Sequence, residues 1–236
     1  MQINGAVALV TGANRGLGKR ISEQLVERGA NVYGAARRPE NVASPGVIPI
    51  RMDITDASSV AAAAAATGDV TLLVNNAGMA SSASLLTGPI DEVRATMESH
   101  FFGTLSVTRA FAPQMMSNAP GAVLNVVSVL SWMHPQMLGA YAAAKTALWA
   151  QSDAVREEFA PHGVAVTALH IGFMDTEMIA DLDTVKTDPA VIARMALDGV
   201  ERGEVEVLTD DMTREAKAAL SNPRLAGAGS TFEAWL

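Results

Sequence analysis

The sequence predicts an α/β fold, a doubly wound parallel sheet of about seven strands with helices on both faces. Two observations carry this prediction. Short apolar runs alternate with longer segments of helical periodicity, and the first apolar run ends at a glycine-rich turn that opens a helix. No Pro/Gly/Ser-rich or charged linker divides the 236 residues, so we expect a single domain over residues 1–236.

The apolar runs set the positions of the strands, and the helical period sets those of the helices. Strands are predicted at residues 6–10, 31–35, 47–50, 70–74, 122–127, 164–170 and 205–208. Helices are predicted at residues 17–29, 56–66, 89–118, 139–161, 188–201 and 211–220, the third of them capped near Thr87 and Gly88. Strands that alternate with helices in this way pair in parallel.

Charge and composition argue against several functions. The formal net charge of −8 provides no general attraction for nucleic acid or anionic lipid, and the absence of cysteine excludes disulfides and thiolate metal sites. The sequence shows neither a signal peptide nor an apolar run long enough to span a bilayer, so we expect a cytoplasmic protein without nucleic-acid or membrane partners. No metal site is expected, because ligand spacing is missing among the histidines, which are His100, His134, His162 and His170.

The first predicted strand ends in a turn that suits a phosphate group. Glycines let the backbone approach a pyrophosphate, and the helix that follows presents free N–H groups and its positive dipole end. A strand, a glycine turn and a helix in this order are typical of a Rossmann-type dinucleotide site. The candidate residues are Gly12, Asn14, Arg15, Gly16, Leu17 and Gly18.

The end of the second strand favours NADP(H) as the cofactor. In a fold of this kind, the adenosine ribose of the cofactor binds at this strand end, and an acidic side chain there hydrogen-bonds the ribose 2′-hydroxyl of NAD. This sequence carries Arg37 and Arg38 instead, which can clamp a 2′-phosphate, and Arg15 is a third candidate. The alternative is that the arginine pair is only a solvated surface feature.

Three further segments occur in a definite order and spacing. Asn75, Asn76, Ala77 and Gly78 close the fourth strand, Tyr141 and Lys145 lie four residues apart on a predicted helix, and Ser128 precedes the tyrosine by 13 residues. Together with the glycine turn, these segments resemble the short-chain dehydrogenase/reductase family over almost the whole chain.

The chemistry of this set suits proton transfer next to a hydride. Tyr141 and Lys145 share a helix face, so the ammonium, together with the positive charge of an oxidised nicotinamide, should lower the pKa of the phenol from its ordinary value of about 10. Tyr141 would then be a usable general acid or base. Ser128 can donate a hydrogen bond to a carbonyl oxygen, although Ser131 is an alternative for this role.

The resemblance also implies further contacts with the cofactor. Lys145 is expected to bond the nicotinamide ribose, Asp53 and Ile54 to hold the adenine, and residues 75–78 to line the cofactor channel. The segment after the sixth strand is expected to grip the carboxamide through Ile171, Gly172, Met174 and Thr176. Ile171 stands where the family usually has proline, which leaves the backbone path of this segment open.

His100 is the main departure from the family pattern. The family normally has a catalytic asparagine at this place, which holds a water that relays protons to the lysine. An imidazole can donate, accept and titrate near neutral pH, so we hypothesise that His100 sustains a modified relay. The alternative is a packing or interface histidine.

The expected substrate wall is apolar and adaptable and is drawn from residues 130–138 and from 173 to about 185. A short substrate-binding region is expected over about residues 173–202. The candidates for substrate contact, besides Ser128, are Trp132, Met133, Met137, Phe173 and Met178. We therefore expect an apolar ketone or aldehyde, although the same residues could serve packing alone. His134 lies in the same loop and could touch the substrate or be merely exposed.

These features predict an NADP(H)-dependent oxidoreductase that moves a hydride between the nicotinamide and a small-molecule carbonyl or alcohol. By resemblance, we also expect a homodimer or homotetramer formed through the two long helices. A non-catalytic NADP(H) sensor or scaffold is the alternative. A dehydratase or epimerase would usually carry a longer C-terminal substrate region than this chain has.

Overall fold

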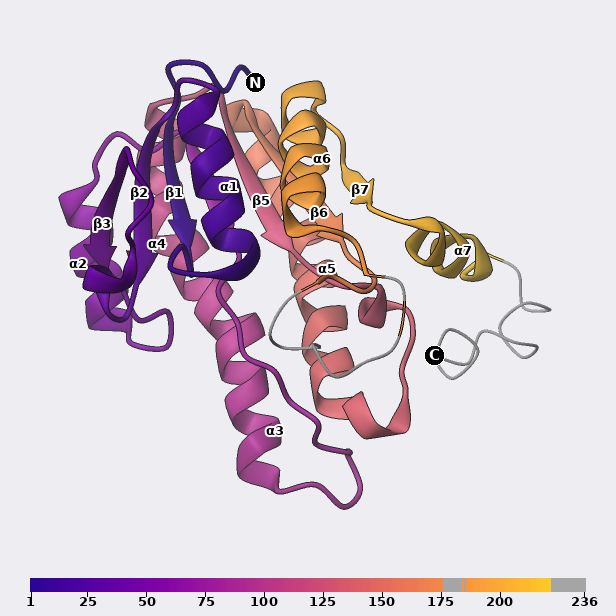
Figure 1. The fold of residues 1–236 in the computed structure, drawn as a ribbon. Coiled ribbons are helices and arrows are strands. Elements are labelled where there is room, and N and C mark those ends of the chain that lie inside the picture. The colour runs from indigo at the N-terminus through magenta and orange to yellow at the C-terminus, as the bar shows by residue number, and fades with distance from the viewer. Residues whose placement is uncertain (176–183, 185, 222–236) are drawn as a thin grey trace.

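The computed structural model describes residues 1–175, 184 and 186–221, which contain a seven-stranded parallel sheet (Figure 1). The order across the sheet is β3-β2-β1-β4-β5-β6-β7. The strands are β1 (Val7–Thr11), β2 (Asn31–Ala36), β3 (Val47–Arg51), β4 (Leu72–Asn75), β5 (Gly121–Val126), β6 (Val164–His170) and β7 (Glu206–Leu208). All adjacent strands pair in parallel, which confirms the predicted doubly wound sheet.

Helices cover both faces because successive strand residues point in opposite directions. Ala8 and Val10 of β1 pack toward α1 (Gly16–Glu27) and α6 (Pro189–Arg202), whereas Leu9 packs in the opposite core. That second core receives α2 (Ala57–Ala66), α4 (Thr104–Ser117) and the end of α5 (Gly139–Phe159). The last described helix, α7 (Asp211–Ala219), follows β7 at the edge of the sheet (Figure 1).

The chain reverses its direction of travel across the sheet between β1 and β4. It runs outward from β1 through β2 to β3, returns to pair β4 with β1, and then continues to β7. In open α/β sheets, ligands bind at the carboxyl ends of the strands beside such a switch point. The glycine turn after β1 and the segment after β4 therefore meet where a ligand is expected.

The predicted helix at residues 89–118 is present but interrupted. It consists of α3 (Ile90–Met97), a π-helical segment at Glu98–Gly103, and α4. The predicted cap near Thr87 and Gly88 is wrong, because the helix begins after Pro89 and the Thr87 hydroxyl instead pairs with that of Ser84, 2.7 Å away. π-Helical turns are frequently found at functional sites, and this one carries His100.

Two observations concern the described residues alone. None of their helices is both long and apolar enough to cross a bilayer. Their His, Asp and Glu side chains do not converge in groups of three that could hold a metal ion.

Candidate active site

The glycine turn between β1 and α1 is held by side chains from both neighbouring strand ends. The Asn76 amide donates to the carbonyl oxygen of Thr11 at 2.8 Å, and the Thr11 hydroxyl oxygen accepts the N–H groups of Asn76 and Ala77 at 2.9 Å each. Gly12 has a φ of +68°, and a Cβ on Gly18 would collide with the Gly12 carbonyl and the Asn76 amide. This packing fixes the N-terminus of α1, which favours an anion.

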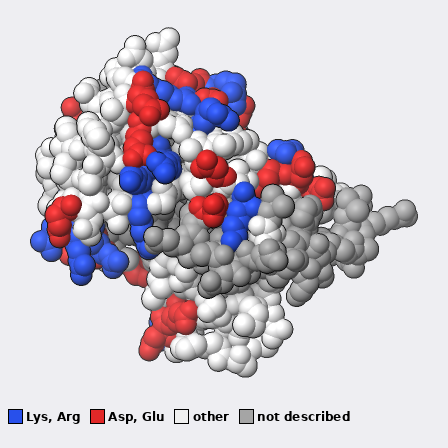
Figure 2. Space-filling model, viewed as in Figure 1, with Lys and Arg blue, Asp and Glu red and all other residues white. Residues whose placement is uncertain are grey.

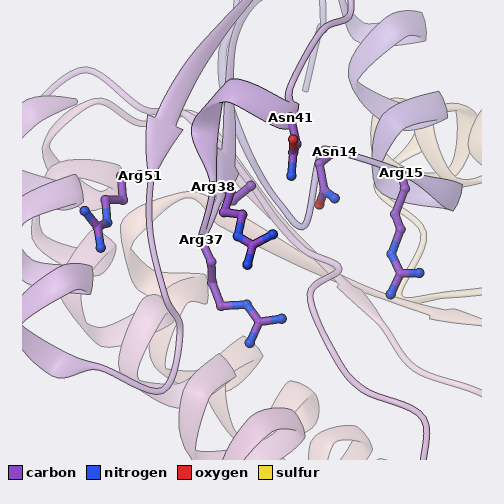
Figure 3. Close-up of a pocket in the computed structure, with 7 residues that line it drawn as sticks. Asn14, Arg15, Arg37, Arg38, Asn41 and Arg51 are labelled. Atoms are coloured by element: carbon purple, nitrogen blue, oxygen red, sulfur yellow. The ribbon is translucent and has the colours of Figure 1, made fainter.

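A basic cavity of about 570 Å³ lies beside this turn. Figure 3 shows arginines from three places around it: Arg15 from the glycine turn, Arg37 and Arg38 from the end of β2, and Arg51 from β3. Figure 2 shows basic side chains gathered where β2 and β3 end. No carboxylate is among the residues that line the cavity, which are Asn14, Arg15, Ala36, Arg37, Arg38, Asn41 and Arg51.

Arg51 and Asn41 were missed by the sequence analysis. Arg51 pairs with Ala36 in the register of β2 and β3, so the ends of the two strands bring their basic side chains to one edge. The predicted strand at residues 47–50 ends immediately before Arg51, and this position was a usable signal. Asn41 comes from a short 3₁₀ turn, Pro39–Asn41, for which no signal was apparent.

A second cavity, of about 340 Å³, continues from the first toward the end of β4. Both cavities are lined by Ala36 and Arg37. Six of the predicted site residues line the second cavity: Gly12, Arg37, Asp53, Ile54, Ala77 and Gly78. Asp53 braces its own segment, because its carboxylate accepts from the N–H and the hydroxyl of Thr55 at 3.1 and 2.8 Å.

Asn75 and Leu17, two further candidates, face inward rather than into the cavities. The Asn75 amide donates to the side chains of Thr108 at 3.1 Å and Asn125 at 2.8 Å, and Leu17 packs in the core under α1. Both residues therefore support the site from within the fold.

Ser128, Tyr141 and Lys145 come together at the end of β5. The Ser128 side chain lies near enough to Tyr141 to act on its pKa, in the direction that lowers it. The Lys145 ammonium donates to the Val126 carbonyl oxygen at 2.7 Å and lies 5.6 Å from the centre of the Tyr141 ring. Ser131, the alternative to Ser128, instead donates its hydroxyl to the Ser128 carbonyl at 2.7 Å, which favours Ser128 for contact with a substrate.

Burial controls the protonation of this group. It raises the pKa of Tyr141 to about 12, against the effect of the Ser128 side chain, and lowers the pKa of Lys145 to about 7. The Tyr141 value is for the chain without a cofactor, so the expectation that Lys145 and an oxidised nicotinamide together lower the phenol pKa stays a prediction. The ammonium is held on the Val126 carbonyl, and burial is the largest cause of the raised Tyr141 pKa. Tyr141 is accordingly a protonated donor at neutral pH.

His100 lies between the segment after β4 and the tyrosine. Its Nε2 is 2.8 Å from the Met79 carbonyl oxygen and 3.3 Å from the Met79 amide nitrogen, and we assign the proton to Nε2 because the contact with the carbonyl is the shorter. Its ring meets the Tyr141 ring edge-on at 5.1 Å. Its Nδ1 is buried and has no hydrogen-bond partner among the described residues.

The charge state of His100 differs from the sequence expectation. Burial and then the Lys145 charge lower its pKa to about 3, while the bond to Met79 opposes the shift. The expected titration near neutral pH is wrong, because the imidazole is too deeply buried to accept a proton there.

The predicted substrate residues are divided between two environments. Met133 and Phe173 pack in the apolar cluster that includes Tyr141, whereas the Met137 side chain is 67% exposed. Trp132 stacks on His170 at 3.9 Å, in an aromatic group on the β6 side. His134 is exposed, with its Nε2 at 3.4 Å from the Thr146 hydroxyl. Two candidates, Thr176 and Met178, lie outside the described residues.

The segment after β6 is held by hydrogen bonds from two sides. The Ile171 carbonyl oxygen accepts the Val129 N–H at 2.9 Å, and the Gly172 N–H donates to the Asp210 carboxylate at 3.1 Å. Met174 forms a parallel bridge with Thr187. Asp210 was missed by the sequence analysis, since nothing in the residues around it indicates a partner 38 positions away.

A parallel sheet with an anion-binding turn at its switch point, and beyond it a buried serine and lysine with a partly buried tyrosine, defines a protein of the dinucleotide-binding α/β class. A family model of short chain dehydrogenases matches residues 6–186. A short chain dehydrogenase from Burkholderia cenocepacia, solved in complex with NADP, is 39% identical, with a TM-score of 0.91 over 96% of this chain and 97% of that one.

Two curated relatives agree with this assignment. The 3-oxoacyl-[acyl-carrier-protein] reductase of Vibrio cholerae is 33% identical over 193 residues, which cover 78% of this chain and 79% of the relative. The 3-ketodihydrosphingosine reductase of Bacteroides thetaiotaomicron is 30% identical over 208 residues, which cover 84% and 77%. The chain belongs to the short-chain dehydrogenase family, and the resemblance inferred from its motifs is confirmed.

The two buried histidines predict a pH-dependent stability. Burial lowers the pKa of His100 from 6.5 to about 3 and that of His170 from 6.5 to about 4. Between pH 4 and pH 6.5 the unfolded chain therefore binds protons that the folded chain does not. The free energy of unfolding should rise with pH in this window by about 1.4 kcal/mol per pH unit for each histidine, and the contribution should level off above pH 6.5.

Urea denaturation at several pH values between 4.5 and 6.5 measures this dependence. His100→Asn should reduce the slope by about one histidine's share, on the order of 1.4 kcal/mol per pH unit. His162→Asn, which removes an exposed histidine, is the matched control. An unchanged slope in His100→Asn would show that this imidazole is protonated in the folded chain.

Proposed function

We propose that this chain is an NADP(H)-dependent oxidoreductase that transfers a hydride between the nicotinamide and a carbonyl or alcohol substrate. The observation that carries the proposal is the group formed by Ser128, Tyr141 and Lys145 at the same sheet edge as the glycine turn. Family membership and the solved complex with NADP of the Burkholderia cenocepacia relative support it.

The residues present fit this cofactor. The collision that a Cβ would cause at Gly18 shows how closely the turn approaches the start of α1, as a pyrophosphate site requires. The cavity lined by Arg15, Arg37, Arg38 and Arg51 has the size and charge for a 2′-phosphate, and the adjoining cavity at Asp53 and Ile54 would take the adenine. Tyr141, Lys145 and the segment with Ile171, Gly172, Met174 and Thr176 would hold the nicotinamide half.

Ser128, Tyr141 and Lys145 would have different roles in the transfer of a proton to the substrate. When bound, the cofactor would supply the hydride. The Ser128 hydroxyl would donate a hydrogen bond to the substrate oxygen as negative charge develops there, and the Tyr141 hydroxyl would transfer its proton to the same oxygen. Lys145 has a pKa of about 7, and in its protonated form it would stabilise the phenolate that this transfer leaves.

His100 is proposed to serve the proton path as a neutral acceptor. The free Nδ1 lone pair is buried beside Tyr141 and can hold a water, although it cannot carry a proton at neutral pH. This replaces the titrating relay of the original hypothesis with an anchoring role.

The substrate is proposed to be an apolar ketone or aldehyde. Tyr141 packs in an apolar cluster with Met133, Leu138 and Phe173. The two curated relatives are named as reductases, of 3-oxoacyl-[acyl-carrier-protein] and of 3-ketodihydrosphingosine, which supports reduction as the main direction. A single domain over residues 1–236, a substrate region near residues 173–202, a cytoplasmic location and a homodimer or homotetramer remain predictions.

Tyr141→Phe tests the reaction. The purified chain is incubated with NADPH or NADH and a panel of carbonyl compounds while cofactor absorbance is followed. We expect turnover that favours bulky apolar ketones over small charged ones, and a loss in Tyr141→Phe on the order of a thousandfold, because the proton donor is removed. NADPH should still bind to the variant.

Tyr33→Phe is the control, since Tyr33 is the other tyrosine of the chain and lies on β2. Tight NADPH binding without turnover of any carbonyl or alcohol would favour the sensor or scaffold. Faster turnover of small charged carbonyls would contradict the apolar substrate.

Arg37→Ala tests the choice of dinucleotide. Removal of a guanidinium from the basic cavity should weaken NADPH binding roughly tenfold to a hundredfold and leave NADH binding nearly unchanged. Fluorescence titration measures both dissociation constants. Arg109→Ala removes the same charge from an exposed site on α4 and should change neither. Equal weakening of both dinucleotides by Arg37→Ala would show that this residue does not read the 2′-phosphate.

His100→Phe and His100→Asn together test the acceptor role. Phe fills the space without a polar atom, so kcat should fall on the order of tenfold, whereas Asn keeps an acceptor and should retain most of the rate. The pH profile of kcat is recorded for both variants. If His100→Phe keeps the rate and the profile of the original chain, His100 is a packing residue.

A further inference from the structure

Asp210, at the N-terminus of α7, uses its two carboxylate oxygens for two different elements. One oxygen accepts the Thr213 N–H at 2.8 Å and caps the helix. The other accepts the Gly172 N–H at 3.1 Å, in the segment after β6. The carboxylate therefore ties the start of α7 to the part of the chain proposed to hold the nicotinamide half of the cofactor.

The two elements fit together closely at this point. A Cβ on Gly172 would collide with the Asp210 carboxylate, so the approach depends on glycine there. The neighbouring Ile171 carbonyl oxygen accepts the Val129 N–H at 2.9 Å and is 3.5 Å from the Ser128 hydroxyl. A continuous path of hydrogen bonds thus runs from α7 through Gly172 and Ile171 to Ser128.

Helix α7 has its own anchors, which hold Asp210 in place. Met212 packs in the same apolar cluster as Val129 and Leu130, directly after Ser128. Lys217 forms an ion pair with Glu206 at 2.7 Å, and its ammonium lies 5.0 Å from the centre of the Trp132 ring. The carboxylate is consequently presented from a docked helix rather than from a free side chain.

We infer that Asp210 is a positioning residue for the nicotinamide half of the dinucleotide site, acting through the Gly172 peptide and not by contact with the ligand. The inference rests on the proposed function. The hydrogen bond from the Gly172 N–H to Asp210 fixes the plane of the peptide between Ile171 and Gly172. The backbone polar groups of residues 171–175 that are not bonded within the fold are thereby oriented toward the ligand. The basic cavity at Arg37 lies on the other side of β1 and does not depend on this bond.

Asp210→Asn tests the inference with the capping function retained. Asn is as good an N-cap as Asp, so its oxygen can still accept from Thr213, but its NH₂ group then opposes the Gly172 N–H. The dissociation constants of NADPH and of adenosine 2′,5′-bisphosphate are measured by titration. The second ligand lacks the nicotinamide half. We expect about tenfold weaker NADPH binding and unchanged binding of the bisphosphate.

Asp56→Asn is the matched control, because Asp56 caps α2 through the N–H groups of Ser58 and Ser59 at 2.9 and 3.2 Å. It should alter neither dissociation constant. Asp210→Ser provides a second variant if Asp210→Asn does not fold, since Ser also caps a helix but is too short to reach Gly172 as well. It should show the same selective loss.

The outcomes separate this inference from the proposed function. Unchanged NADPH binding in both Asp210 variants overturns the inference, and so does equal weakening of NADPH and the bisphosphate, which would indicate general loosening of the fold. In either case, NADPH binding and turnover by the original chain leave the proposed function intact. Failure of the original chain to bind NADPH would overturn the proposed function itself.

Discussion

The site depends above all on the parallel pairing of β1 with β4 and on the threonine that locks the ends of these strands together. The Thr11 hydroxyl donates to the Val74 carbonyl at 3.2 Å while its oxygen accepts two N–H groups from the segment that follows β4. This places the glycine turn directly beside residues 76–78, so that one ligand can touch both. Without this junction, the basic cavity and Tyr141 would belong to two unrelated edges.

Burial then decides what the polar groups can do. The same loss of solvation keeps Tyr141 protonated, keeps His100 neutral and brings the pKa of Lys145 to about 7. Only the lysine is left able to change its charge near neutral pH. A phenol in such a place is a poor base until a positive charge arrives nearby, so binding of an oxidised, positively charged nicotinamide would favour its ionisation.

Much of the fold was predictable because a buried parallel strand is a short apolar run, and every predicted strand corresponds to one in the sheet. Arg15, Arg37 and Arg38 were predictable because strand ends on one edge of a parallel sheet converge. The π-helical turn at His100 was not, since it depends on how the imidazole packs against Gly78 and Tyr141. The pKa shifts also escaped prediction, because spacing along a helix reveals neighbours but not the depth of burial.

Different parts of the fold support the basic cavity and the reaction centre. Substitutions in these two halves of the site should therefore have different consequences. The basic cavity is built on β1, β2 and β3, where its arginines are near solvent and can be exchanged without disturbing the core. The reaction centre is built on β5 and β6 and is braced from β7 and α7 through Asp210 and Lys217. Its polar groups lie close together and are held by backbone groups of the surrounding segments, so a change at one of them alters the surroundings of the rest. Dinucleotide preference can therefore vary freely among relatives of this fold, whereas the proton-transfer group and its braces must vary together.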